Sequence, residues 1–166
     1  MPAVSSFDVT STVDLQEIDN AVNQARKEVA QRYDFKGSNA SIDFNKAENT
    51  VTLAAEDQMK LNALWDVLQT RMVRRNVPVK NLKLGDIETA SGSSVRRVIT
   101  LQQGIPGDAA RDIIKLLKDQ KLKKVQASIQ GDQLRISSAS KDELQDVIRV
   151  LRDHDFGIAL QFGNYR

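Results

Sequence analysis

The stretch Lys124-Val-Gln-Ala-Ser-Ile-Gln-Gly-Asp-Gln-Leu-Arg-Ile-Ser137 decides the fold, because it has the pattern of a complete β-hairpin. Val125, Ala127 and Ile129 alternate with polar residues, which is the period of a strand with one buried face. Gly131-Asp132 stands where a tight hairpin needs a residue that tolerates positive φ. The apolar residues after the turn continue the alternation. The stretch therefore predicts two antiparallel strands joined by a two-residue turn.

Helices are predicted on both sides of this hairpin. A lysine-rich helix is expected from about residue 108 to 121, where apolar residues recur at helical spacing. After the hairpin, Ser140 and Glu143 have the spacing of a capping box, which marks the start of another helix. A last strand is expected over residues 158–162, so this half of the chain supplies a helix, a hairpin, a helix and a strand.

The same order occurs once earlier in the chain. Asp14 and Glu17 form a second predicted capping box, and a shift of 87 residues places Ala40-Ser-Ile42 on Ala127-Ser-Ile129. The other elements expected in this half are a strand at 5–11, a hairpin around 40–54, a helix from about 57, a strand at 82–88, a linker at 90–94 and a strand at 95–103. The chain is therefore predicted to contain an internal duplication.

Each copy has the order β-α-β-β-α-β. Short hairpins and right-handed crossovers make this order a four-stranded antiparallel sheet with two helices on one face, the ferredoxin-like plan of an α+β protein. The sheet face without helices is left to solvent or to a ligand. In the second copy that open face would carry Gln126, Ser128, Gln130, Gln133, Arg135 and Ser137.

Composition excludes several classes of function. The 166 residues include no cysteine, which excludes disulfides and thiolate catalysis, and only one histidine, which excludes a histidine cluster. The chain has no signal-peptide pattern and no apolar run long enough to span a membrane. It also lacks the phosphate-binding loop that ends in Gly-Lys-Ser/Thr. We therefore expect a cytoplasmic, non-enzymatic protein without cofactor or metal and without a membrane partner.

Charge is unevenly distributed along the chain. Residues 58–124 contain 14 Lys and Arg against 6 Asp and Glu, although the whole chain has a net charge of only +2. A basic segment of this kind is a candidate anion-binding surface. The alternative is an ordinary solvated face, and the two are equally consistent with the sequence.

Eight motifs spread along the chain resemble the YajQ family of bacterial proteins. They are Ser6-Phe-Asp-Val9, Val13-Asp-Leu-Gln-Glu17, Arg32-Tyr-Asp-Phe-Lys-Gly37, Gln103-Gly-Ile105, Lys115-Leu-Leu-Lys118, Lys121-Leu122, Gln126-Ala-Ser-Ile-Gln-Gly-Asp132 and Gln161-Phe-Gly-Asn-Tyr-Arg166. The resemblance implies two ferredoxin-like domains that exchange their first strands. Carried over, one domain would span 12–103 and take the strand at 95–103, and the other would combine 1–11 with 104–166.

The resemblance also implies a nucleotide-binding protein. Family members are associated with RNA and nucleoside triphosphates, and some with cyclic di-GMP, so the identity of the ligand does not carry over. Our main hypothesis is therefore binding of a nucleotide, a cyclic dinucleotide or RNA through basic and polar residues. The rival hypothesis is a protein-interaction module, such as a transcription co-factor, whose basic face meets an acidic partner.

The residues expected to bind the nucleotide are basic, amide or glycine residues that suit phosphate or base contacts. They are Lys36, Gly37, Arg97, Gln103, Lys115, Lys118, Gln130 and Arg135.

Two of these positions have structural alternatives. Gly37 also suits a helix stop with Phe35 in the core, and Gln103-Gly104 either offers free N–H groups to an anion or only forms a turn. No aromatic residue occurs on the third strand of either copy, unlike RNA-recognition motifs, so we expect low sequence specificity. The remaining aromatic candidates for RNA contact are Phe162 and Tyr165.

Overall fold

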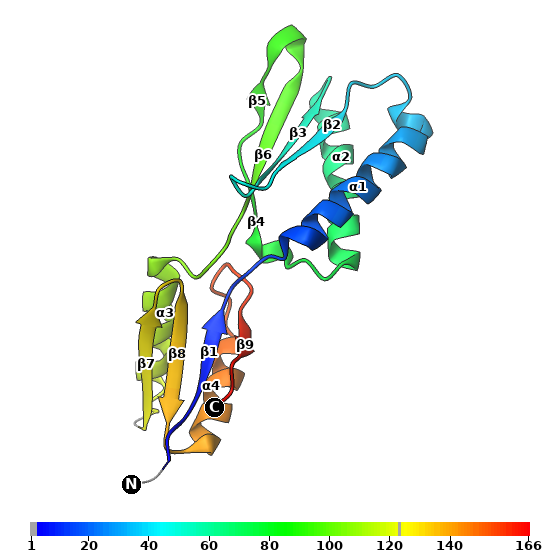
Figure 1. The fold of residues 1–166 in the computed structure, drawn as a ribbon. Coiled ribbons are helices and arrows are strands. Elements are labelled where there is room, and N and C mark those ends of the chain that lie inside the picture. Colours follow the sequence, from blue (N-terminus) through cyan, green and yellow to red (C-terminus); the bar gives the residue numbers. More distant parts are fainter. Residues whose placement is uncertain (1–2, 123) are drawn as a thin grey trace. The chain divides into compact units, whose positions relative to one another are not determined.

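A computed structural model describes residues 3–122 and 124–166 (Figure 1). The chain divides into two compact units. One combines the residues up to Thr12 with Gln103–Arg166 and is called the terminal unit below. The other spans Val13–Gln102 and is called the middle unit. Each unit has its own sheet and its own apolar core.

The terminal unit is one antiparallel sheet covered by two helices. Its elements are β1 (Ser5–Thr10), α3 (Gly107–Asp119), β7 (Val125–Gln130), β8 (Gln133–Ser138), α4 (Lys141–Arg152) and β9 (Gln161–Gly163). The strand order is β7-β8-β1-β9, and both α3 and α4 lie on one face of this sheet (Figure 1). The other face carries no helix.

The middle unit repeats this arrangement. Its elements are α1 (Leu15–Gln31), β2 (Ser41–Asn45), β3 (Thr50–Ala55), α2 (Gln58–Arg74), β4 (Leu82–Leu84), β5 (Glu88–Thr89) and β6 (Val95–Leu101), with 3₁₀ turns at Tyr33–Phe35, Val79–Asn81 and Ser91–Ser93. The strand order is β2-β3-β6-β4, and β5 also pairs with β6. The predicted fold class, α+β with two ferredoxin-like units, is confirmed.

The central strand of the terminal sheet comes from the start of the chain. β1 comes first in the sequence, yet it lies between β8 and β9 of the terminal unit. β6 lies between β3 and β4 of the middle unit. Phe7 and Val9 of β1 are buried among apolar residues of α3, α4 and β8. Burying side chains of this size contributes roughly 1.5–3 kcal/mol each, so the terminal unit depends on residues at the start of the chain.

Three boundaries differ from the sequence prediction. The segment 90–94 is not a linker, because it connects β5 to β6 within one sheet and the Ala90 N–H donates to the Ser94 carbonyl at 2.7 Å. The strand expected at 82–88 is two short strands, with the Gly85 N–H bonded to the Val98 carbonyl between them. The last strand begins at Gln161, three residues later than expected, although Ile158 is buried.

The predicted helix starts are confirmed, but neither capping box is complete, since at α4 the Ser140 N–H donates to the Ser138 hydroxyl at 3.0 Å and not to Glu143. The Asp14 carboxylate accepts from the Gln16 N–H, and the Ser140 hydroxyl accepts from the Glu143 N–H, as N-caps do. Glu17 does not complete a capping box, because its carboxylate accepts from Arg75 of α2 at 3.1 Å. That ion pair joins the two helices of the middle unit instead.

The domain boundaries stay a prediction, and separate expression tests them. Residues 13–102 contain all strands of their sheet, so we expect this fragment to fold alone. Residues 103–166 lack the central strand β1, so we expect them to remain largely unfolded until a synthetic peptide of residues 1–12 is added. Circular dichroism and thermal melting would follow both. A peptide with Val9→Asp is the control and should not restore folding, and cooperative folding of 103–166 without any peptide would contradict the assignment.

Candidate functional site

The open face of the terminal sheet is polar throughout. Register places Gln126 opposite Ser137, Ser128 opposite Arg135 and Gln130 opposite Gln133, so these six residues share one face, as predicted. Leu134 and Ile136 between them are fully buried against the helices. β1 extends the same open face with Ser6, Asp8 and Thr10.

A buried carboxylate lies at the centre of this face. Asp8 is only 4% exposed and accepts hydrogen bonds from three side chains. The Asn164 amide donates at 2.9 Å, the Arg135 Nε at 3.2 Å, and the two terminal nitrogens of Arg166 at 3.3 and 3.4 Å. The side chains of these four residues, called the Asp8 cluster below, carry a net charge of +1. Two arginines are thus held side by side around one carboxylate.

The cluster keeps Asp8 ionised. The hydrogen bond from Asn164 lowers the pKa of Asp8 most, burial acts in the opposite direction, and the guanidinium groups of Arg166 and Arg135 lower it further, to about 2. The carboxylate is therefore charged at every physiological pH. It can orient both arginines without competing for a proton.

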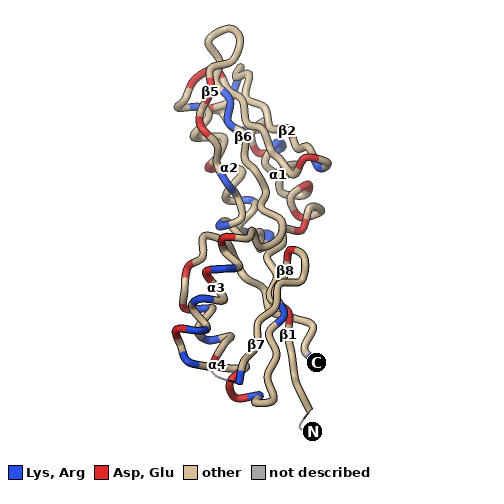
Figure 2. The backbone as a smooth tube through the Cα atoms, turned by 90° about the vertical axis from the view of Figure 1, so that its left-hand side faces the viewer, with Lys and Arg blue, Asp and Glu red and all other residues tan. Residues whose placement is uncertain are grey.

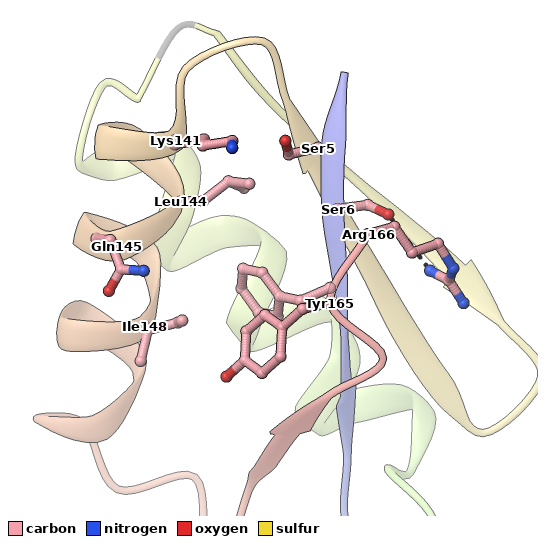
Figure 3. Close-up of a pocket in the computed structure, with 9 residues that line it drawn as sticks. Ser5, Ser6, Lys141, Leu144, Gln145, Ile148, Tyr165 and Arg166 are labelled. Carbon is pink, nitrogen blue, oxygen red and sulfur yellow. Dashed lines mark hydrogen bonds between the residues drawn. The ribbon is translucent and has the colours of Figure 1, made fainter. Parts of the chain in front are cut away.

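A local bend brings the last residues into this cluster. Asn164 has a φ of 52°, and beyond it Arg166 and Ser6 exchange backbone hydrogen bonds of 2.9 and 3.2 Å. The bend sends Arg166 to the open face and Tyr165 to the helix-covered face (Figure 3). There the Tyr165 ring lies 6.0 Å from that of Phe7. Tyr165 remains 63% exposed there, over a hollow of about 250 Å³ that Leu144 and Ile148 of α4 also line (Figure 3).

Arg135 is arranged to bind an anion. Its Nε donates to Asp8, and no described residue accepts from its two terminal nitrogens. The side chain is 43% exposed. A guanidinium fixed through Nε presents its terminal N–H groups as a planar fork, which matches two oxygens of a phosphate.

The residues predicted to bind nucleotide do not form one group within the terminal unit. Gln130 lies on the open face with Arg135, and its amide donates to the Ser128 hydroxyl at 3.2 Å. Lys115 and Lys118 lie on α3, which covers the opposite face of the sheet. Figure 2 shows basic and acidic residues following one another along α3. One small ligand on the open face would not reach both sets.

The middle unit holds three of the predicted residues. Lys36 and Gly37 line a hollow of about 590 Å³ beside β2. Phe35 is buried in the core and Gly37 has a φ of 75° with open space around its Cα, so the glycine serves the helix-to-strand turn. Arg97 lies opposite Leu53, on the helix-covered side, and its Nε donates to the Gly85 carbonyl at 2.8 Å.

Anion binding at Gln103-Gly104 stays a prediction, but two N–H groups of this turn are already bonded. The Gly104 N–H donates to the Ser11 carbonyl at 2.6 Å, and the Ile105 N–H donates to the Asp132 carbonyl at 2.9 Å. Gly104 has a φ of 86°, and a Cβ there would lie 2.7 Å from the Asp132 side chain. Glycine is required because the hairpin turn approaches closely, which supports the structural alternative for this motif.

Phe162 also lies away from the open face. Its ring meets Phe7 edge-on at 6.0 Å, and the Arg152 guanidinium lies 5.4 Å from its centre, so it packs on the helix-covered side. Within residues 3–122 and 124–166, no three His, Asp or Glu side chains gather closely enough to hold a metal ion. No helix in the described part of the chain is long and apolar enough to cross a membrane.

Comparison with known proteins adds the family. Residues 5–166 match the model of a family described as nucleotide-binding protein YajQ-like. The chain belongs to the YajQ family. It is 49% identical over 164 residues to a nucleotide-binding protein of Koribacter versatilis, covering 99% of this chain and 98% of that one. It is 47% identical over 166 residues to a nucleotide-binding protein of Chloroherpeton thalassium, covering the whole of both.

Sequence reasoning found Gln130 and Arg135 on the open face but missed the rest of the Asp8 cluster. Asp8, Asn164 and Arg166 enter the sequence analysis only as members of the family motifs Ser6–Val9 and Gln161–Arg166, with no charged or polar role predicted for them. The missing signal was a charged residue in the middle of a central strand, a position where a buried charge requires partners.

The pKa of Asp8 yields a prediction about stability. A folded-state pKa of about 2 against an ordinary 3.8 stabilises the fold at neutral pH by about 2 kcal/mol, and this contribution disappears as pH falls from about 4 to about 2. Asp8→Asn should therefore lower the free energy of unfolding at pH 7 by about that amount. Urea denaturation should show that the difference in free energy of unfolding between parent and variant is roughly halved at pH 3. A gap independent of pH would contradict this role for the carboxylate.

Proposed function

We propose that the chain binds a nucleotide on the open face of the terminal sheet, with a phosphate group held by Arg135. The main support is the geometry of Arg135, whose Nε is fixed by the buried Asp8 while its terminal nitrogens meet no described acceptor. The names of the relatives, which are nucleotide-binding proteins, support the same ligand class.

Electrostatics favours an anion at this place. Asp8 neutralises one of the two arginines in its cluster, so one positive charge remains beside a row of neutral hydrogen-bonding side chains. Hydrogen bonds to charged groups contribute roughly 1.5–3 kcal/mol each. A phosphate at Arg135 would gain this contribution without displacing any contact that the fold uses.

The base and sugar would lie along β7 and β8. The amides of Gln126, Gln130 and Gln133 and the hydroxyls of Ser128 and Ser137 can each donate and accept. No aromatic side chain stands on this face among the described residues, so recognition rests on charge and hydrogen bonds rather than on stacking. Such a site suits a nucleoside triphosphate, a cyclic dinucleotide or a short single-stranded RNA, with low sequence specificity.

In this proposal the protein acts by binding, without catalysis, in the cytoplasm. Lys115 and Lys118 form a second candidate surface for a phosphate backbone, on the other side of the sheet from Arg135. Lys36, Gly37, Arg97 and Gln103 remain candidate contacts that no observation favours over the open face.

Two matched variants distinguish the open face from α3. Arg135→Lys keeps the charge but removes the planar fork, and it should weaken nucleotide binding by about tenfold, the equivalent of about 1.4 kcal/mol. Lys115→Ala combined with Lys118→Ala removes two charges from the opposite side and should leave affinity within about twofold. Calorimetric titration with GTP, cyclic di-GMP and a short single-stranded RNA would measure both.

The reverse pattern would contradict the proposed site. The double lysine variant would then lose nucleotide affinity and show a weaker salt dependence of binding, while Arg135→Lys would bind as the parent does. That result would place the phosphate contacts on α3. If the parent protein bound none of the three ligands, the rival function, an interaction module for an acidic protein partner, would be favoured.

A further inference from the structure

The two sheets differ at their equivalent edge strands, β7 and β2. The outward groups of β7 follow from the hydrogen-bond pattern. Ser6 exchanges backbone hydrogen bonds with Arg166. The backbone N–H and C=O groups of Ser6 and Asp8 in β1 therefore point away from β8, while those of Phe7 and Val9 point toward it. Alternation along antiparallel strands then fixes β8 and β7 in turn. Ala127 and Ile129 direct their N–H and C=O groups outward, away from the sheet, and the Val125 N–H on the same side donates to the Leu122 carbonyl at 3.2 Å.

In the middle unit the corresponding edge is blocked. The backbone groups of Ile42 in β2 point outward in the same way, and the Ile42 carbonyl accepts a hydrogen bond from the Arg26 Nε of α1 at 2.9 Å. The Ile42 side chain is only 3% exposed. A guanidinium that occupies an edge carbonyl prevents another strand from pairing there, which is a common protection of sheet edges.

β7 has no such protection among the described residues. Neither a charged residue nor a proline occurs in Val125–Gln130, and no described side chain donates to an outward carbonyl of this strand. Ile129 is 53% exposed, unusually for an isoleucine on the helix-facing side. An uncharged, partly apolar edge strand is a ready template for a further strand.

A groove runs beside this edge. It is a hollow of about 360 Å³, lined by Ile114, Leu117 and Lys118 of α3, by Leu122, and by Val125, Gln126 and Ala127 of β7. An added strand would place alternate side chains into this groove while its backbone paired with β7. The site therefore offers both backbone hydrogen bonds and apolar contacts.

The charges around the groove identify the partner. Lys118 lines the groove, and Lys115, Lys121 and Lys124 are exposed directly beside groove residues in the sequence, whereas the exposed acidic residues nearby are Asp112 and Asp119. A second copy of this chain would bring its own α3 lysines onto the same side of the joined sheet, where like charges repel. An acidic segment is complementary to them.

We propose that β7 accepts an acidic, strand-forming segment of a partner protein as a fifth strand of the terminal sheet. Apolar side chains of the segment enter the groove beside α3, and its carboxylates meet the lysines. This surface lies at the edge and on the helix-covered side of the sheet, whereas Arg135 lies on the open face, and Gln126 of β7 borders both.

A labelled heptapeptide of alternating glutamate and valine tests the proposal with the whole protein. Fluorescence anisotropy should show saturable binding that weakens with salt, while the same peptide with lysine for glutamate should bind at least tenfold more weakly. Methylation of the backbone N–H groups that would face β7 should reduce binding to a similar degree. Equal affinity of all three peptides would overturn the proposal.

Three protein variants locate the binding. Ala127→Pro removes an outward N–H that makes no bond to β8, and it should weaken binding about tenfold. Lys118→Glu changes only an exposed charge, so it tests the site without threatening the fold, and it should reduce the preference for the acidic over the basic peptide severalfold. Lys141→Glu, the same charge change at an exposed position of α4, is the matched control and should have little effect.

Two other outcomes would overturn the proposal. Sedimentation of the protein as a dimer without peptide, abolished by Ala127→Pro, would assign the edge to a second copy of the chain. Displacement of the peptide by a short oligouridylate, with affinity unchanged in Ala127→Pro, would make the groove a nucleic-acid surface.

Discussion

The terminal unit depends on the placement of β1 between β8 and β9. Its odd-numbered residues, Phe7 and Val9, complete the apolar core under α3 and α4. Its even-numbered Asp8 collects Arg135, Asn164 and Arg166 on the other face. A single strand thus stabilises the core and positions the charged groups of the candidate site, so folding of this unit and formation of the site are coupled.

The fold could be predicted from the sequence because its signals are local. Alternation along the hairpin of β7 and β8, helix spacing and N-capping residues each act over a few positions, and the structure confirms the elements they predict. These local patterns gave wrong boundaries where pairing between strands determines the structure. Residues 90–94 have the composition of a linker, but pairing of β5 with β6 makes them a hairpin connection.

The candidate site was harder to predict because its contacts are distant in sequence. Asp8 and Arg135 are 127 residues apart, and Asp8 and Asn164 are 156 apart. The choice of Arg135 and Gln130 came from the face of one hairpin, which alternation reveals. The choice of Lys115 and Lys118 came from charge alone, and charge does not say which side of the sheet a helix covers.

The two units have equivalent strand orders but different surfaces. In the middle unit, ion pairs such as Arg71 with Glu28 at 2.7 Å and Arg75 with Glu17 at 3.1 Å join the two helices, and Arg26 closes the sheet edge. In the terminal unit the edge strand is open and the arginines gather around Asp8 on the helix-free face. We therefore expect binding to be concentrated in the terminal unit, with the middle unit more self-contained.

The most direct test of this account is nuclear magnetic resonance of the isotope-labelled protein during titration with GTP, cyclic di-GMP or a short single-stranded RNA. The account predicts that one of these ligands shifts the backbone signals of β7 and β8 from Gln126 to Ser137, together with the side-chain signals of Arg135 and Arg166. Shifts confined to α3 or to residues 13–102, with those signals unmoved, would contradict it.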